Sequence, residues 1–117
     1  MNRANLVKFC NGMPSVTEEY PFGDGVSVFK VVGKMFALVP VAAKPMTMTL
    51  KCDPELAVWL RQKYAAVEPG YHTNKKHWNT VTLDGSIDDA ELREMVEHSY
   101  DCVVASLPKS KRPTSTA

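Results

Sequence analysis

The side chains best suited to contact another molecule occur in one polar and aromatic segment. That segment is Tyr71-His72-Thr73-Asn74-Lys75-Lys76-His77-Trp78. Lysine side chains neutralise phosphates, so Lys75 and Lys76 are candidate phosphate contacts. The rings of His72 and Trp78 can stack on unpaired bases, and the Asn74 amide can hydrogen-bond a base edge or a phosphate. The segment therefore predicts a nucleic-acid contact site.

The same residues also have structural interpretations. Asn74 is a residue type that favours turns, and Lys75 can support the loop that contains it. Trp78 begins a predicted strand and can pack in the core. Both interpretations of the segment stay open on the sequence alone.

A second basic cluster follows Pro108 near the end of the chain and consists of Lys109, Lys111 and Arg112. These side chains can contact phosphates. They also follow a predicted helix directly, where cations stabilise the negative end of the helix dipole. Capping of that helix is the favoured interpretation, and phosphate contact is the alternative.

Residues that commonly bind metals or act in catalysis do not converge in this sequence. His72 and His77 are five positions apart, which fits neither one helix face nor one strand face. His98 and Cys102 are four apart, but one such pair is not a tetrahedral site. There is no Gly-x-Ser-x-Gly elbow and no phosphate-binding loop. We expect no enzyme activity, no metal and no cofactor.

Length and composition predict a single-domain protein that resides in the cytoplasm. The chain has 117 residues and a net charge of +1, so any nucleic-acid role must rest on local basic clusters. It has three cysteines and no Cys-x-x-Cys, which is typical of a reducing compartment. The cysteines are Cys10, Cys52 and Cys102. We expect a monomeric domain over residues 1–112, a disordered tail over residues 113–117 and no membrane partner.

Capping residues and helical spacing predict three helices. The first covers residues 2–11. The second begins at Asp53, whose carboxylate can cap the helix, and Pro54 suits its first turn. The third begins at Asp88, which has capping-box spacing to Glu91. Its apolar stripe consists of Leu92, Val96, Tyr100, Val103 and Leu107.

The predicted strands either alternate apolar and polar side chains or are rich in β-branched residues. They are expected at residues 26–32, 35–39, 46–50 and 78–83. The link Gly33-Lys34 predicts a type II′ hairpin, and residues 15–25 predict a loop. With one further short strand, this gives an α+β fold in the order α-βββ-α-ββ-α. Its antiparallel sheet of about five strands is covered by helices on one face.

Several motifs, taken together, resemble the MmcQ/YjbR family of small bacterial proteins. The motifs are Pro21-Phe22-Gly23, Lys30-Val31-Val32-Gly33-Lys34-Met35-Phe36-Ala37, Asp53-Pro54-Glu55-Leu56, Asn74-Lys75-Lys76-His77-Trp78 and Ser99-Tyr100 with Leu107-Pro108. The resemblance implies a CyaY-like or secretion-chaperone-like α+β fold. It also implies DNA binding through a double-wing arrangement. Fold analogy alone does not establish that function.

Two functions therefore remain, and each makes a spatial prediction. A DNA-binding protein should bring its two basic clusters to one surface. A protein-interaction or chaperone-like module should instead present an apolar patch, for which the uncovered face of the sheet is the candidate.

Overall fold

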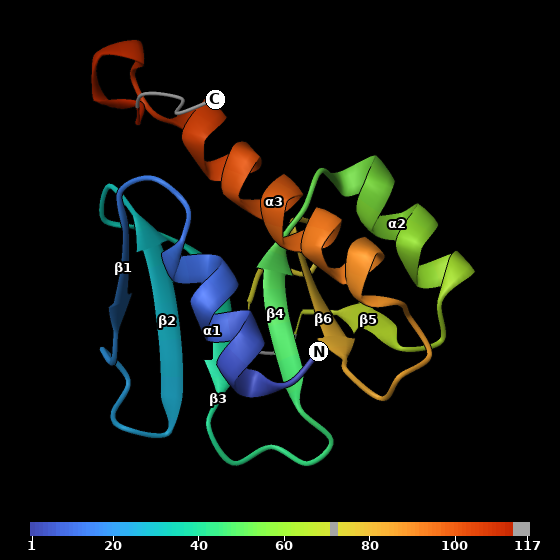
Figure 1. The fold of residues 1–117 in the computed structure, drawn as a ribbon. Coiled ribbons are helices and arrows are strands. Elements are labelled where there is room, and N and C mark those ends of the chain that lie inside the picture. The colour runs from blue at the N-terminus through green and yellow to red at the C-terminus, as the bar shows by residue number, and fades with distance from the viewer. Residues whose placement is uncertain (71–72, 114–117) are drawn as a thin grey trace.

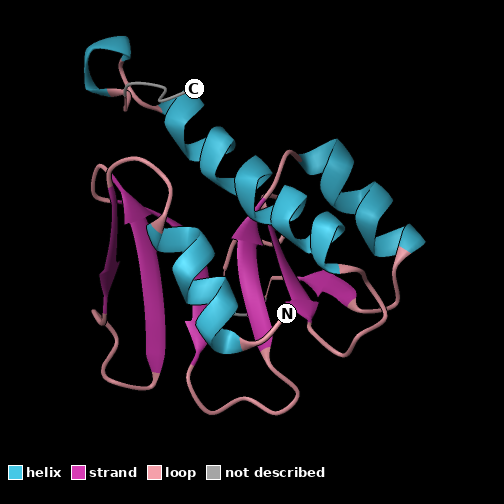
Figure 2. Cartoon of the chain, in the orientation of Figure 1, coloured by secondary structure: helices cyan, strands magenta, loops and turns pink. Residues whose placement is uncertain are grey.

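A six-stranded antiparallel sheet carries three helices on one face (Figures 1 and 2). The computed structural model describes residues 1–70 and 73–113. The helices are α1 (Arg3–Asn11), α2 (Pro54–Lys63) and α3 (Asp89–Ser106), followed by a short 3₁₀ helix, η1 (Lys109–Lys111). The α+β class is confirmed, and the predicted tail is described only at its first residue, Pro113, since residues 114–117 lie outside the described residues.

The strands are β1 (Val16–Glu19), β2 (Val26–Val31), β3 (Lys34–Pro40), β4 (Thr47–Lys51), β5 (Val67–Pro69) and β6 (Trp78–Thr82). They lie in the order β1-β2-β3-β4-β6-β5, and every pair is antiparallel.

The predicted loop at residues 15–25 was wrong in part, because it contains β1. This edge strand pairs with β2 along its whole length, and Glu19 forms an ion pair with Lys30 at 3.3 Å. Its sequence Val-Thr-Glu-Glu has one apolar residue. An edge strand needs little apolar character, which explains why the sequence signal was weak.

The β2–β3 hairpin is confirmed, but its turn residues were wrong. Val31 pairs with Lys34, so Val32 and Gly33 are the two turn residues. Their φ angles are +49° and +79°, which is the type I′ rather than the type II′ geometry. A β-branched residue such as Val32 is rare at positive φ, and the sequence therefore favoured the wrong pair.

Side-chain caps start all three helices, and those at Asp53 and Asp88 are the caps that the sequence predicts, whereas the cap at Asn2 was not predicted. The side-chain oxygens of Asn2, Asp53 and Asp88 each accept backbone N–H groups of the first turn. Only half of the capping box at α3 forms, because the Glu91 carboxylate instead accepts a hydrogen bond from the Tyr64 hydroxyl at 3.1 Å.

The core lies between the sheet and the helices. The predicted apolar stripe of α3 is buried throughout, from Leu92 to Leu107. The Tyr100 hydroxyl donates to the carbonyl of Pro14 at 2.7 Å, as a buried tyrosine requires. Ser99 is fully buried and joins two strands: its Oγ donates to the Phe36 carbonyl at 2.5 Å and accepts from the Lys51 N–H at 2.8 Å.

The other face of the sheet, here called the open face, has no helix over it among the described residues (Figure 2). One row across it consists of Leu38, Thr49 and Thr80, which are register partners on β3, β4 and β6. The two threonine Oγ1 atoms lie 2.9 Å apart. This face thus carries threonines on β4 and β6 next to an apolar side chain on β3.

Within the described residues, none of the helices is long and apolar enough to span a lipid bilayer.

Candidate nucleic-acid interface

The segment between β5 and β6 forms a turn at residues 74–77. The Asn74 side-chain oxygen accepts the N–H of Lys76 at 2.9 Å, and its carbonyl accepts the N–H of His77 at 3.1 Å. Asn74 therefore has the turn role that its residue type suggests. The turn leaves Lys75 and Lys76 exposed. His72, the remaining candidate in this segment, lies outside the described residues.

Arg61, on α2, ties this turn to the rest of the protein. Its Nε donates to Oδ1 of Asn79 at 2.6 Å, and its Nη2 donates to the carbonyls of Lys75 and, at 3.3 Å, Trp78. Asn79 in turn donates to the Ala57 carbonyl on α2. Sequence reasoning missed Arg61. Its partners are 14 to 18 residues away, so no local pattern indicated it.

The start of β6 is close-packed against Gly70. The Gly70 N–H donates to the Trp78 carbonyl at 2.8 Å. A Cβ at position 70 would lie 2.7 Å from the Trp78 Cβ, so only glycine fits there. Trp78 is partly buried and pairs across strands with Lys51. The core cluster, as the described residues define it, does not include Trp78.

The second basic cluster has divided roles. Arg112 caps α3: its Nε donates to the Leu107 carbonyl at 3.1 Å, and its Nη2 donates to the Ala105 carbonyl at 3.0 Å. This confirms the capping interpretation for Arg112. Lys109 and Lys111 on η1 are exposed.

The two clusters lie at the same end of the sheet but on separate segments. Lys51 ends β4 opposite Trp78, which follows the 74–77 turn. Ser99 on α3 hydrogen-bonds to the backbone of Phe36 and of Lys51, the last residue of β4. The part of α3 after Ser99 therefore extends beyond the end of β4. Figure 1 shows η1 projecting beyond α3, whereas the segment before β6 lies behind the sheet. One continuous basic face, as a DNA-binding surface requires, is not formed by these two clusters alone.

The same end carries a further lysine that the sequence analysis did not single out. Lys34 is exposed and follows the Val32-Gly33 turn of the β2–β3 hairpin. Because β3 and β4 are antiparallel, with Ala37 opposite Leu50, the start of β3 and the end of β4 lie together. The hairpin and the 74–77 turn are thus two basic projections from this end.

The thiol and imidazole groups make local contacts near the start of α2. His98 Nε2 accepts the Asp53 N–H at 3.2 Å and lies 3.4 Å from Sγ of Cys102. Burial raises the pKa of the Cys52 thiol to about 12, and the nearby Cys102 adds to the shift. Across residues 1–70 and 73–113, there is no group of three or more His, Cys, Asp or Glu side chains placed to hold a metal ion.

Comparison with known proteins gives a family. The YjbR family model matches residues 11–102. The chain belongs to the YjbR family. It is 36% identical over 112 residues to the uncharacterized protein YjbR of Escherichia coli (strain K12), covering 96% of this chain and 95% of that protein. It is 38% identical over 97 residues to the uncharacterized protein YbdF of Escherichia coli O157:H7, covering 83% and 80%.

Solved structures agree with the family fold. The crystal structure of the Deinococcus radiodurans protein DR2400, with a DUF419 domain, is 40% identical and has a TM-score of 0.88, covering 93% of this chain and 83% of that one. A crystal structure of a Pseudomonas syringae protein is 28% identical with a TM-score of 0.75, covering 87% and 98%. The YjbR family match includes the 74–77 turn and stops before η1.

Proposed function

We propose that this YjbR-family protein binds nucleic acid, in the first place DNA, through the end of the sheet that carries the β2–β3 turn. The observation that supports this most is that lysines of three separate segments lie at that end: Lys34 after the hairpin turn, Lys51 at the end of β4, and Lys75 and Lys76 in the 74–77 turn. Lys109 and Lys111 lie on η1, which projects beyond α3 (Figure 1).

Phosphate contacts supply most of the affinity in this proposal. A net charge of +1 provides no general attraction, so binding depends on where the charges lie. The β2–β3 hairpin and the 74–77 turn act as the two wings, with Arg61 holding the second wing in place. Binding involves no chemical step and no cofactor, and we place the protein in the cytoplasm as part of this proposal.

The test is the double variant Lys75→Ala with Lys76→Ala. Both side chains are exposed, so the stability of the protein should stay within about 0.5 kcal/mol of the parent. Affinity for unrelated DNA duplexes should fall by a similar factor for each sequence. The slope of log affinity against log salt should shrink by about one for each phosphate that the variant no longer neutralises.

The matched control is Lys44→Ala with Lys63→Ala, which removes the same charge from exposed positions in the β3–β4 loop and at the end of α2. The control should bind as the parent does. Equal loss of affinity in both double variants would show that the 74–77 turn is not a contact site. Absence of parent binding to DNA and RNA at low salt, where attraction is strongest, would reject the proposal.

Protein interaction through the open face is the second candidate, and one hollow favours it. A cavity of about 470 Å³ lies on this face, lined mainly by apolar and threonine side chains such as Val26, Leu38 and Thr47. Phe22 borders it and is 65% exposed, so a large apolar ring faces solvent at its rim. Under this function, Phe22→Ser should abolish capture of a specific protein that the Lys75/Lys76 variant still captures.

A further inference from the structure

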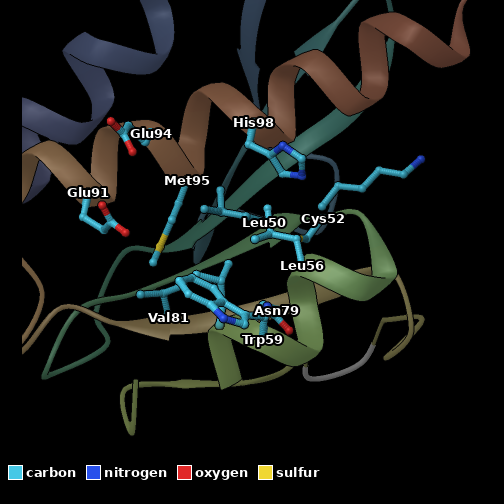
Figure 3. A pocket seen from close by; sticks show the side chains of 12 residues that line it. Leu50, Cys52, Leu56, Trp59, Asn79, Val81, Glu91, Glu94, Met95 and His98 are labelled. Atoms are coloured by element: carbon cyan, nitrogen blue, oxygen red, sulfur yellow. The ribbon is translucent and has the colours of Figure 1, made fainter. Parts of the chain in front are cut away.

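A second hollow lies on the opposite side of the sheet, between α2 and α3 (Figure 3). Its volume is about 290 Å³, near the lower limit for pockets that hold small molecules. Apolar side chains from the sheet and both helices form most of its surface: Leu50, Leu56, Leu60, Val81 and Met95. An apolar pocket of this size suits one small organic body rather than a macromolecule.

An aromatic ring borders this pocket from α2. Trp59 is 50% exposed although it lines the pocket, and Figure 3 shows its indole across from α3. The ring already holds a cation, because Lys63 Nζ lies 4.7 Å from its centroid. Indole is the aromatic side chain that best attracts cations over its face. One face of the indole therefore already carries the Lys63 ammonium group, and a ligand in the pocket would have to use the rest of the ring.

Charged groups are distributed unequally around the pocket. Glu91 and Glu94 occupy one end, one turn apart on α3, and His98 lies at the other end (Figure 3). Lys51 is the cation among the lining residues. The Glu91 Oε1 accepts the Tyr64 hydroxyl, a hydrogen bond that holds this carboxylate near α2. A ligand entering at the Glu91–Glu94 end meets two carboxylates and the indole.

We propose that this pocket binds a small organic cation with an apolar body, of the arylalkylamine type. The apolar body packs against Leu56, Val81 and Met95, and the ammonium group lies between the carboxylates and the Trp59 ring. Opposite charge and cation–π attraction act on the same group, and Glu91, which is partly buried, contributes more than the exposed Glu94. The proposal does not depend on nucleic-acid binding, because the contacts that it uses are the carboxylates, the indole and the apolar wall of the pocket.

The experiment uses three ligands of similar shape: phenethylamine, the neutral 2-phenylethanol and the anionic 3-phenylpropanoate. Binding to the purified protein is followed by NMR at the indole N–H of Trp59 and the methyl group of Met95. Phenethylamine should bind about tenfold more tightly than the alcohol, which corresponds to about 1.4 kcal/mol. The carboxylate should bind more weakly than the alcohol.

Variants separate the pocket from general surface charge. Glu91→Gln with Glu94→Gln should bring the amine and the alcohol to similar affinity, and Trp59→Ala should weaken amine binding several-fold. Glu97→Gln removes an exposed carboxylate from the same helix outside the pocket and should leave binding unchanged. The proposal is overturned if the amine and alcohol bind equally to the parent, if no ligand shifts the Trp59 and Met95 signals, or if Glu97→Gln weakens binding as much as the pocket variants.

Discussion

The two faces of the sheet differ in how deeply their side chains are buried, and two residues of β3 show the difference. Phe36 points to the helices, is fully buried and meets the Tyr100 ring edge-on at 5.5 Å between centroids. Leu38 lies on the open face, partly exposed, and opposite Thr49. Residues two apart on a strand normally share a face. Here the register between β2 and β3 shifts after Phe29 and leaves Phe36 as an extra, unpaired residue of β3, so the two side chains point to opposite faces. One strand therefore contributes to two very different environments.

We infer from this difference that the covered face mainly stabilises the fold, whereas the open face and the 74–77 turn are available for contact with a partner. Burial on the helix-covered face supplies most of the free energy of folding, because transfer of apolar area out of water is its main source. Side chains on the open face and in the 74–77 turn contribute less, so they can be altered for contact with a partner at little cost in stability. The following predictions test that division.

The largest effect is expected from Phe36→Ala. Removing a fully buried ring leaves a cavity, which costs about 3–5 kcal/mol of unfolding free energy. Leu38→Ala on the same strand should cost about 1 kcal/mol or less, because Leu38 is partly exposed already. Urea denaturation measures both. Similar destabilisation by the two variants would show that the open face is as important to stability as the covered face.

Ser99→Ala tests the polar link within the covered face. The variant leaves the Lys51 N–H and the Phe36 carbonyl without this partner, and a destabilisation of about 1–3 kcal/mol is expected. Ser106→Ala is the matched control on α3, where the hydroxyl only bonds to the Val103 carbonyl of its own helix. The control should change stability by less than about 0.5 kcal/mol. An equally mild Ser99 variant would argue against a structural bridge.

Arg61→Ala tests how the 74–77 turn is attached to the covered side. The variant removes three hydrogen bonds from a charged group, and the expected destabilisation is about 1–2 kcal/mol. Amide hydrogen exchange at His77 and Gly70 should accelerate more than the overall decrease in stability explains. Arg93→Ala, at an exposed position of α3, should change neither quantity. Unchanged exchange in the Arg61 variant would contradict the attachment.

The smallest effect concerns pH and a buried thiol. Burial, with a smaller contribution from Glu18, raises the pKa of Cys10 from 9.0 to about 12. The unfolded chain therefore loses this proton at lower pH than the folded protein does. The contribution of the protonated Cys10 thiol to the free energy of unfolding is fully present below about pH 9. It is lost as the pH rises toward 12.

Between pH 8 and pH 10 the expected decrease in stability is about 1 kcal/mol. Urea denaturation of the parent and of Cys10→Ala should show a steeper alkaline decline in the parent. Parallel declines would mean that Cys10 titrates alike in both states.

Local signals made much of the fold predictable. Asp53 and Asp88 cap their helices through bonds to residues two or three positions away, so the sequence signal is local. The stripe from Leu92 to Leu107 repeats at the helical period. The central strands have enough apolar residues to be recognised.

Features that depend on distant partners were missed. β1 is a strand because β2 offers it an edge, and nothing in Val-Thr-Glu-Glu requires that state. The β2–β3 turn follows the register of the strands, which forces Val32 into positive φ. At the candidate interface, Lys75 and Lys76 were proposed as contacts from their residue type, and both are exposed. Their support by Arg61 crosses 14 residues and has no sequence signature.

The two outer strands, β1 and β5, are the edges at which another strand could pair with this sheet. β1 presents Glu18 and Glu19 along its edge, and β5 is three residues long and ends in Pro69, which has no N–H to donate. Neither edge is a good template for another strand. Edge-to-edge pairing of sheets from two copies is therefore disfavoured at both edge strands. This opposes the growth of fibrils from the native state.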